Sequence, residues 1–167
     1  MRQSKVIASC GMAAALSIVV MLVGGVLGLG MYISPMIAGF LLLPIGQKYG
    51  VKYQWMLWSA VSLLCFILVP NVEENLMYFS LFGLYPILYP YFERMTSKLK
   101  WLCKLLYFNI IVVAVEALVM LVLVPEVMGP GMAVILLLMG NAIFIMYDFL
   151  LPRSELLFRK YFGKLKR

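Results

Sequence analysis

Long apolar runs separated by short polar stretches dominate the chain. A membrane-crossing helix needs about 20 predominantly apolar residues, and six stretches approach that length. The predicted spans are Val6–Leu29, Tyr32–Gly46, Tyr53–Val69, Leu76–Phe92, Leu105–Val124 and Gly131–Leu151. The second stretch is short, so a re-entrant segment is the alternative to a full span there. The pattern predicts an all-α, polytopic membrane protein with six transmembrane helices.

Turn-forming residues mark the boundaries between these spans. The stretch Pro70–Glu74 is typical of a turn in which the Asn71 side chain caps the fourth span. Glu74, three residues later, is placed to return a hydrogen bond to Asn71 as in a capping box. Pro125 and Pro130 bracket a second turn of the same kind. All connections are short, which leaves no room for a soluble domain between the spans.

The residues after Pro152 form a different kind of segment. Helical spacing places Phe158, Phe162 and Leu165 on one face and basic side chains on the other. Such a helix lies in the headgroup region rather than crossing the bilayer. We therefore expect one six-helix domain at residues 1–152, followed by a basic amphipathic cytoplasmic tail at residues 153–167.

The charge distribution orients the predicted spans. The chain is 65% hydrophobic and only 13% charged, yet it carries a formal net charge of +7. With six spans and both termini inside, all 14 Lys and Arg residues fall on the cytoplasmic side, and Glu73, Glu74 and Glu126 fall outside. This predicts a multi-pass plasma-membrane protein whose basic side meets anionic headgroups and binds no nucleic acid.

Glu116 is the first candidate for a functional residue, because it lies near the middle of the fifth span. A charged carboxylate there costs about 2.5–3.5 kcal/mol, so it is either a site or a neutral group hydrogen-bonded to a neighbouring helix. Asn141 lies at similar depth in the sixth span, where an interhelical hydrogen bond is the favoured role. For Asp148 we expect an interfacial ion pair with Arg153, and for Asn109 a structural role.

The fourth span combines an aromatic stripe with two prolines. The stripe contains Tyr78, Phe82, Tyr85 and Tyr89, and the neighbouring stripe contains Pro86 and Pro90. Each proline frees the carbonyl four residues earlier, and a freed carbonyl in a membrane must find a partner or face a wet cavity. The two interpretations are an aromatic ligand wall and a bent helix repaired by its neighbours. The prolines lie toward the cytoplasmic end, which favours the bent helix and leaves Tyr78 and Phe82 as the better pocket residues.

The first span carries small residues at helical spacing. Ser9, Ala13 and Ser17 share one face, with Gly11 and Ala15 beside them. Such a stripe lets helices approach closely. It serves either another subunit or packing within the chain, and we favour internal packing.

Several functions are not expected from the residues present. The three cysteines show no metal-ligand spacing, and the chain has no histidine. The chain also shows no nucleotide-binding or hydrolase motif. We therefore expect no enzyme activity, cofactor or metal, and any energy for transport must come from a partner or an ion gradient.

Six loop-poor helices with both termini inside and the small-residue stretch ASCGMAAALS resemble the substrate-binding S components of energy-coupling factor transporters. The resemblance implies capture of a small molecule from the outer side and dependence on a transmembrane coupling subunit and ATPases. It implies partner docking through Ser9, Gly11, Ala13, Ala15 and Ser17. It implies substrate binding in the outer half, within reach of Glu116, Asn141, Tyr78, Phe82 and Tyr85.

Two other classes of function fit the same sequence. One is a small structural or scaffolding protein of cell-envelope assembly, in which Glu116 only joins helices. The other is an ion- or proton-coupled carrier component, in which Glu116 titrates.

Overall fold

The computed structural model describes residues 2–27, 32–122 and 130–164. Every regular element in these ranges is a helix, which confirms the predicted all-α class. Three of the described helices are long and apolar enough to cross a membrane, at Gln3–Val26, Val51–Leu68 and Ser97–Leu121. They overlap the first, third and fifth predicted spans, and each begins and ends earlier than predicted.

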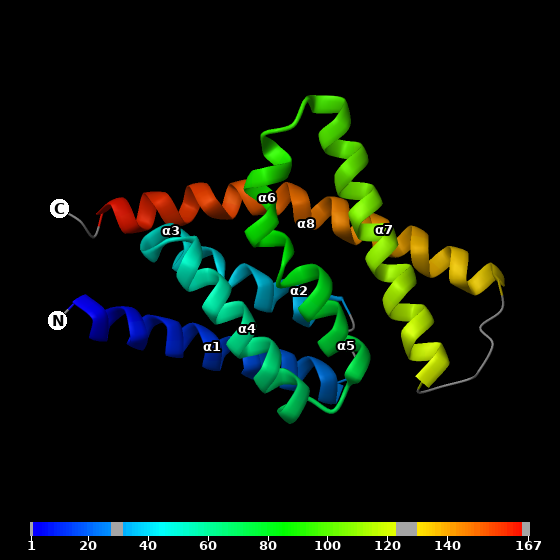
Figure 1. Ribbon diagram of the computed structural model, residues 1–167, viewed down its shortest axis with the longest axis horizontal. Coiled ribbons are helices and arrows are strands. Elements are labelled where there is room, and N and C mark those ends of the chain that lie inside the picture. The colour runs from blue at the N-terminus through cyan, green and yellow to red at the C-terminus, as the bar shows by residue number, and fades with distance from the viewer. Residues whose placement is uncertain (1, 28–31, 123–129, 165–167) are drawn as a thin grey trace.

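The described helices pack against one another as one assembly (Figure 1). Helix α1 packs against α2 and α4, and α7 packs against α8. The start of α1 and the end of α8 lie toward the same side of Figure 1. The elements are α1 (Arg2–Leu27), α2 (Ile33–Phe40), α3 (Leu43–Tyr49), α4 (Val51–Leu68), α5 (Val72–Met77), the π-helix η1 (Tyr78–Phe82), α6 (Tyr85–Glu93), α7 (Ser97–Val122) and α8 (Pro130–Lys164).

The second predicted span is not one helix. It consists of α2 and α3, separated by a turn at Leu41 and Leu42. Pro44 lies in the first turn of α3, where the missing amide hydrogen costs nothing. Gly50 then adopts a positive φ of 103°, which lets the chain turn directly into α4.

The fourth predicted span is also interrupted. Helix α5 passes into the π-helix η1, and a turn at Gly83 and Leu84 precedes α6. The Gly83 amide donates to the Tyr78 carbonyl, five residues earlier, at 2.8 Å. Pro86 lies in the first turn of α6, so it marks the start of a new helix rather than a bend within an old one.

Carbonyls freed at this interruption find donors on three other helices. The Phe82 carbonyl accepts from the Tyr147 hydroxyl at 3.0 Å, as the prediction of repair by neighbours requires. Two earlier carbonyls also accept hydrogen bonds from side chains of other helices. That of Phe79 accepts from Trp58 Nε1 at 3.2 Å, and that of Ser80 accepts from the Tyr107 hydroxyl at 2.6 Å. Side chains of α4, α7 and α8 thus donate hydrogen bonds to the carbonyls at the break.

Helix α8 differs from the prediction at its C-terminal end. It is continuous from Pro130 to Lys164 and passes through Pro152 without a break (Figure 1). The predicted boundary between a span and a separate tail helix is therefore not a helix boundary. A single proline can be carried within a long helix where neighbouring groups satisfy the freed carbonyl.

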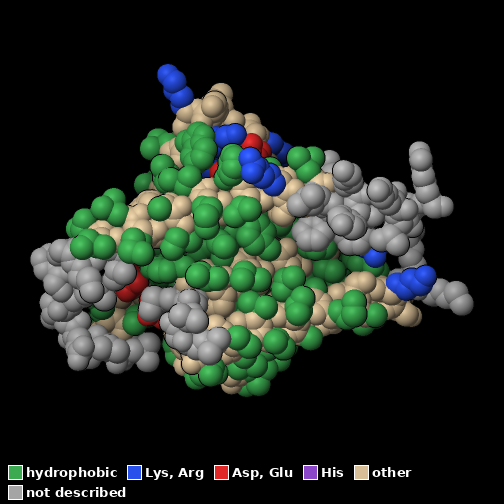
Figure 2. Space-filling view, turned by 180° about the vertical axis from the view of Figure 1, so that it is seen from behind, with side chains coloured by type: hydrophobic (Ala, Val, Ile, Leu, Met, Phe, Trp, Pro, Cys, Tyr) green, Lys and Arg blue, Asp and Glu red, His purple; other side chains and the backbone are tan. Residues whose placement is uncertain are grey.

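The core is mostly aromatic on the α6–α8 side and aliphatic on the α1–α4 side. The aromatic part is built around Phe82, Tyr85, Phe108, Phe144 and Tyr147, all of them at most 1% exposed. The outer surface is apolar as well, since hydrophobic side chains spread across the described part of the face shown in Figure 2. A surface of this kind is compatible with an integral membrane protein.

Candidate functional site

Glu73 and Glu74 of α5, together with Glu116 of α7, form what we call the acidic cluster. The Asn71 side chain caps α5, accepting from the Glu73 and Glu74 amides at 3.1 and 3.2 Å. The predicted cap is therefore confirmed. It places both glutamates in the first turn of the helix, where the helix dipole favours negative charge.

Glu74 is fully buried, and its carboxylate has two different oxygen environments. Oε1 accepts a hydrogen bond from the Ser34 hydroxyl of α2, while Oε2 has no hydrogen-bond partner. The side chain does not return to Asn71 as the predicted capping pair would, because Ser34 holds it. Burial raises the pKa of Glu74, and the hydrogen bond from Ser34 lowers it by a smaller amount.

Two glycines of α1 make room for the Glu74 carboxylate. A Cβ atom on Gly24 would overlap the Ser34 side chain and lie 3.0 Å from Glu74 Oε1. A Cβ atom on Gly25 would lie 3.0 Å from Oε2. The α1 backbone therefore covers the carboxylate at a distance that no other residue type allows without displacement.

Glu73 precedes Glu74 in α5, so its side chain lies about 100° away around the helix, and it interacts with Glu116. Burial raises the pKa of Glu73 to about 7, and the charge and hydrogen bond of Glu116 add to the effect. Tyr32, at the start of α2, lies within electrostatic reach of both carboxylates. Within the described ranges, no Lys or Arg forms an ion pair with any member of the acidic cluster.

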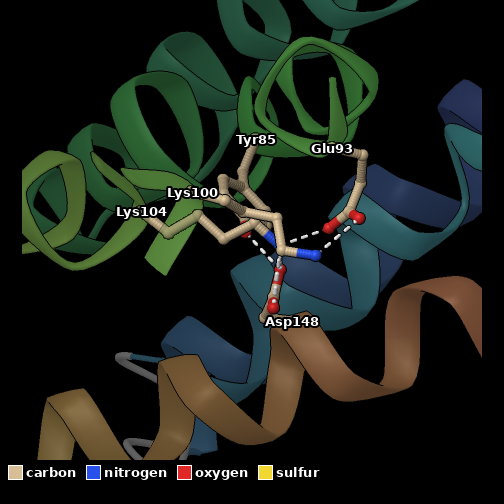
Figure 3. A network of polar contacts seen from close by, with 5 residues as sticks. All are labelled: Tyr85, Glu93, Lys100, Lys104 and Asp148. Atoms are coloured by element: carbon tan, nitrogen blue, oxygen red, sulfur yellow. Dashed lines mark hydrogen bonds and ion pairs between the residues drawn. The ribbon is translucent and has the colours of Figure 1, made fainter. Parts of the chain in front are cut away.

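A second polar group, which we call the lysine network, joins α6, α7 and α8 (Figure 3). Lys104 Nζ donates to Asp148 Oδ1 and Oδ2 at 2.7 and 2.9 Å, and to Glu93 Oε1 at 2.7 Å. Lys100 donates to Glu93 Oε2 at 2.9 Å, and the Tyr85 hydroxyl donates to Asp148. Lys104 is only 1% exposed and uses all three of its donors.

The predicted partner of Asp148 was wrong. Arg153 is five residues away on the same helix, which turns it about 140° from Asp148, and its guanidinium lies 4.1 Å from the Phe149 ring centroid. The ion-pair partner of Asp148 is instead Lys104, which lies on the neighbouring helix α7. Sequence spacing along one helix did not reveal this contact between helices.

Asn141 pairs with Asn109 across α7 and α8. Each amide donates to the other's side-chain oxygen at 3.0 Å and also to its own preceding turn, at Leu105 and Leu137. The interhelical role expected for Asn141 is therefore confirmed. Both N–H donors of each amide are therefore used within the protein.

The aromatic candidates are packed rather than open. Tyr78, Phe82 and Tyr85 are all 0% exposed. Glu116 contacts Glu73, whereas Tyr85 contacts Asp148. Of the five predicted substrate-binding residues, Glu116 thus belongs to the acidic cluster and Tyr85 to the lysine network, while Asn141, Tyr78 and Phe82 belong to neither. Sequence reasoning missed Ser34 and Glu74 as a pair, because 40 residues separate them.

The small-residue stripe of α1 is also divided. Ser9 hydrogen-bonds the Tyr49 hydroxyl at 3.0 Å, Ser17 donates to the Ala38 carbonyl at 3.5 Å, and Ala13 packs against the core. Gly11 and Ala15 are exposed on the other face. Internal packing therefore accounts for three of the five predicted docking residues.

Comparisons with protein-family models, with curated proteins and with solved structures find no match to this chain. Within the described residues, no group of three His, Cys, Asp or Glu side chains is arranged to hold a metal ion. The class defined by the fold is an all-helical protein with three helices suited to crossing a membrane.

Proposed function

We propose that this protein is the membrane-embedded substrate-binding subunit of a transporter, dependent on a partner ATPase complex for energy. The observation that carries the proposal is Glu74, a fully buried carboxylate where α1, α2 and α5 meet. Ionisable groups buried in so apolar a protein generally mark substrate or ion sites. The two segments that supply Ser34 and Glu74 are interrupted helices, which are the elements that form binding sites in many transporters.

In the proposed topology all six segments cross or enter the plasma membrane, with both termini cytoplasmic. The positive-inside distribution supports this orientation. Figure 1 also supports it, because the start of α1 and the end of α8 lie on the same side of the molecule. The acidic cluster then faces outward, and the lysine network lies near the cytoplasmic side. Anionic headgroups contact the basic residues there.

The proposed partner surface is the exposed face of α1. Gly11 and Ala15 are exposed on this face, and nothing lies within 4 Å of a Cβ built on Gly11. Small exposed residues allow close approach of another helix. The proposed partner is a transmembrane coupling subunit with its ATPases, as in the S components that the sequence resembles.

Native purification with mass spectrometry of proteins and small molecules tests the proposal. We expect a coupling subunit, ATPases and a bound small molecule to copurify with the full chain. Ala15→Leu should remove the partners and leave the small molecule bound, while Ala114→Leu, at another exposed alanine, should change neither. Recovery of cell-envelope assembly proteins instead, with no small molecule, would favour the scaffolding alternative.

The Glu73–Glu116 pair supports a second candidate function, a proton-coupled carrier component. A carboxyl pair that includes a group titrating near pH 7 can exchange a proton under cellular conditions. In proteoliposomes, Glu116→Gln should then abolish proton flux. Unchanged flux in that variant would refute this candidate.

A further inference from the structure

The negative charge of the acidic cluster is not balanced by a described cation, whereas that of the lysine network is. Glu93 and Asp148 both contact Lys104, but Glu73, Glu74 and Glu116 have no ion pair within the described part of the chain. Figure 2 shows Lys and Arg gathered at the top and right of its face, with a separate acidic group at the lower left. Buried carboxylates without a cation are costly, so they are neutralised by protons or by a bound positive charge.

Glu74 supplies an independent indication of a ligand. The side chain is 0% exposed, and Oε2 accepts no hydrogen bond although Oε1 does. A carboxylate oxygen accepts readily from charged donors, and buried acceptors are rarely left unpaired. A hydrogen-bond donor would complete the environment of Oε2, and a positively charged donor would also balance the negative charge of the acidic cluster.

The directions of the carboxylates limit the shape of that ligand. Glu73 and Glu74 are successive residues of α5, so their side chains diverge by about 100°. Glu74 contacts Ser34 of α2, and Glu73 contacts Glu116 of α7. Within the described residues these acids do not converge in a metal-binding group. Two separated negative positions suit a ligand with two separated positive charges.

We propose that the acidic cluster binds a small organic diamine or polyamine. One ammonium group donates to Glu74 Oε2 when α1 moves away at Gly24 and Gly25, which cover this carboxylate. A second ammonium group interacts with the Glu73–Glu116 pair. This inference rests on the proposed function, because it names the class of substrate that the transporter subunit takes.

Binding of radiolabelled putrescine to the full chain in lipid nanodiscs tests the proposal. We expect saturable binding that spermidine displaces and choline does not, because choline carries charge without an N–H donor. A charge-assisted hydrogen bond contributes about 1.5–3 kcal/mol, so Glu74→Gln should weaken binding by about tenfold or more. Glu93→Gln is the matched control, since it removes the same charge from the lysine network, and it should leave binding unchanged.

Glu116→Gln keeps the test decisive if Glu74→Gln fails to fold, because Glu116 is only half-buried. It should also weaken putrescine binding. Equal binding in wild type and both carboxylate variants would overturn the proposal, as would no saturable binding of putrescine or spermidine. Binding of Mn²⁺ that requires Glu74, without amine binding, would assign the cluster to a metal instead. A neutral or anionic small molecule recovered by native mass spectrometry would overturn the amine class while leaving the transporter proposal intact.

Discussion

The lysine network and the acidic cluster both bury a carboxylate between helices, but they balance its charge differently. Asp148 receives two hydrogen bonds from Lys104 and one from Tyr85. Glu74 receives one from Ser34 and leaves its other oxygen unpaired. Lys104 brings α6, α7 and α8 together, whereas no cation of the described chain joins the helices around Glu74.

The difference separates a structural role from a functional one. A buried ion pair with all its hydrogen bonds made fixes the relative positions of the helices that supply it. A buried carboxylate with an unpaired oxygen retains free energy that a ligand can recover on binding. For this reason we propose that the substrate binds at the acidic cluster and that the lysine network joins the helices.

Removing Lys104 should have the largest effect on stability. Lys104→Met leaves Asp148 buried without a cation, and breaking a buried pair in this way costs about 3–5 kcal/mol. Lys100→Met is the control, since the Lys100–Glu93 pair is partly exposed and should contribute below about 1 kcal/mol. The free energy of unfolding in mixed micelles measures both. Equal losses in the two variants would show that Lys104 does not hold the network together.

Filling the space beside Glu74 should have the next largest effect. Gly24→Ala forces Ser34 and Glu74 apart, and overpacking of this kind costs about 1–3 kcal/mol. Gly11→Ala is the same change on the same helix with open space around it, so it should not destabilise. Thermal unfolding of both variants checks the contrast. A Gly24→Ala variant as stable as Gly11→Ala would contradict the close packing of α1 on Glu74.

The two regions should respond to pH with opposite signs. The pKa of Glu73 is raised to about 7 by burial and by Glu116, so its contribution is complete below about 4.5 and is lost as pH rises through 7. For Glu93, burial acts to raise the pKa, but the hydrogen bonds and charges of Lys104 and Lys100 outweigh it and lower the pKa. Its contribution is present above about 4.5 and is lost as pH falls.

Unfolding free energies between pH 4 and pH 8 check these signs. Glu73→Gln should flatten the loss at the alkaline end, which is on the order of 1 kcal/mol after screening by solvent. Glu93→Gln should flatten only the loss at the acid end. A Glu73→Gln variant with an unchanged pH profile would show that the Glu73–Glu116 pair does not carry the alkaline response.

The smallest effect should come from the neutral amide pair, which lies in neither polar group. In a double-mutant cycle, Asn109→Ala and Asn141→Ala should show a coupling energy of about 0.6 kcal/mol, the typical value for hydrogen bonds between membrane helices. Unfolding of the four proteins measures it. A coupling as large as the Lys104 effect would place this pair among the groups that determine helix arrangement.

Local features were predictable because their causes lie within a few residues. The Asn71 cap needs only its own side chain and the next two amides, and the need of the Phe82 carbonyl for a donor follows from Pro86 alone. The donor itself, Tyr147, is 65 residues away and belongs to α8. The π-helix at Tyr78–Phe82 also had no local signal, and the donors to its Phe79, Ser80 and Phe82 carbonyls come from three other helices.

By itself, the sequence determined the helical class, the apolar character of the segments and the cap of α5, because periodicity, hydropathy and near-neighbour hydrogen bonds are properties of a short stretch of chain. Only the tertiary structure decided which charges meet. Lys104 finds Asp148 instead of solvent, and Glu74 finds Ser34 and the Gly24 backbone instead of a lysine. Those pairings depend on the rotation and crossing of helices, which the packing of the whole chain sets.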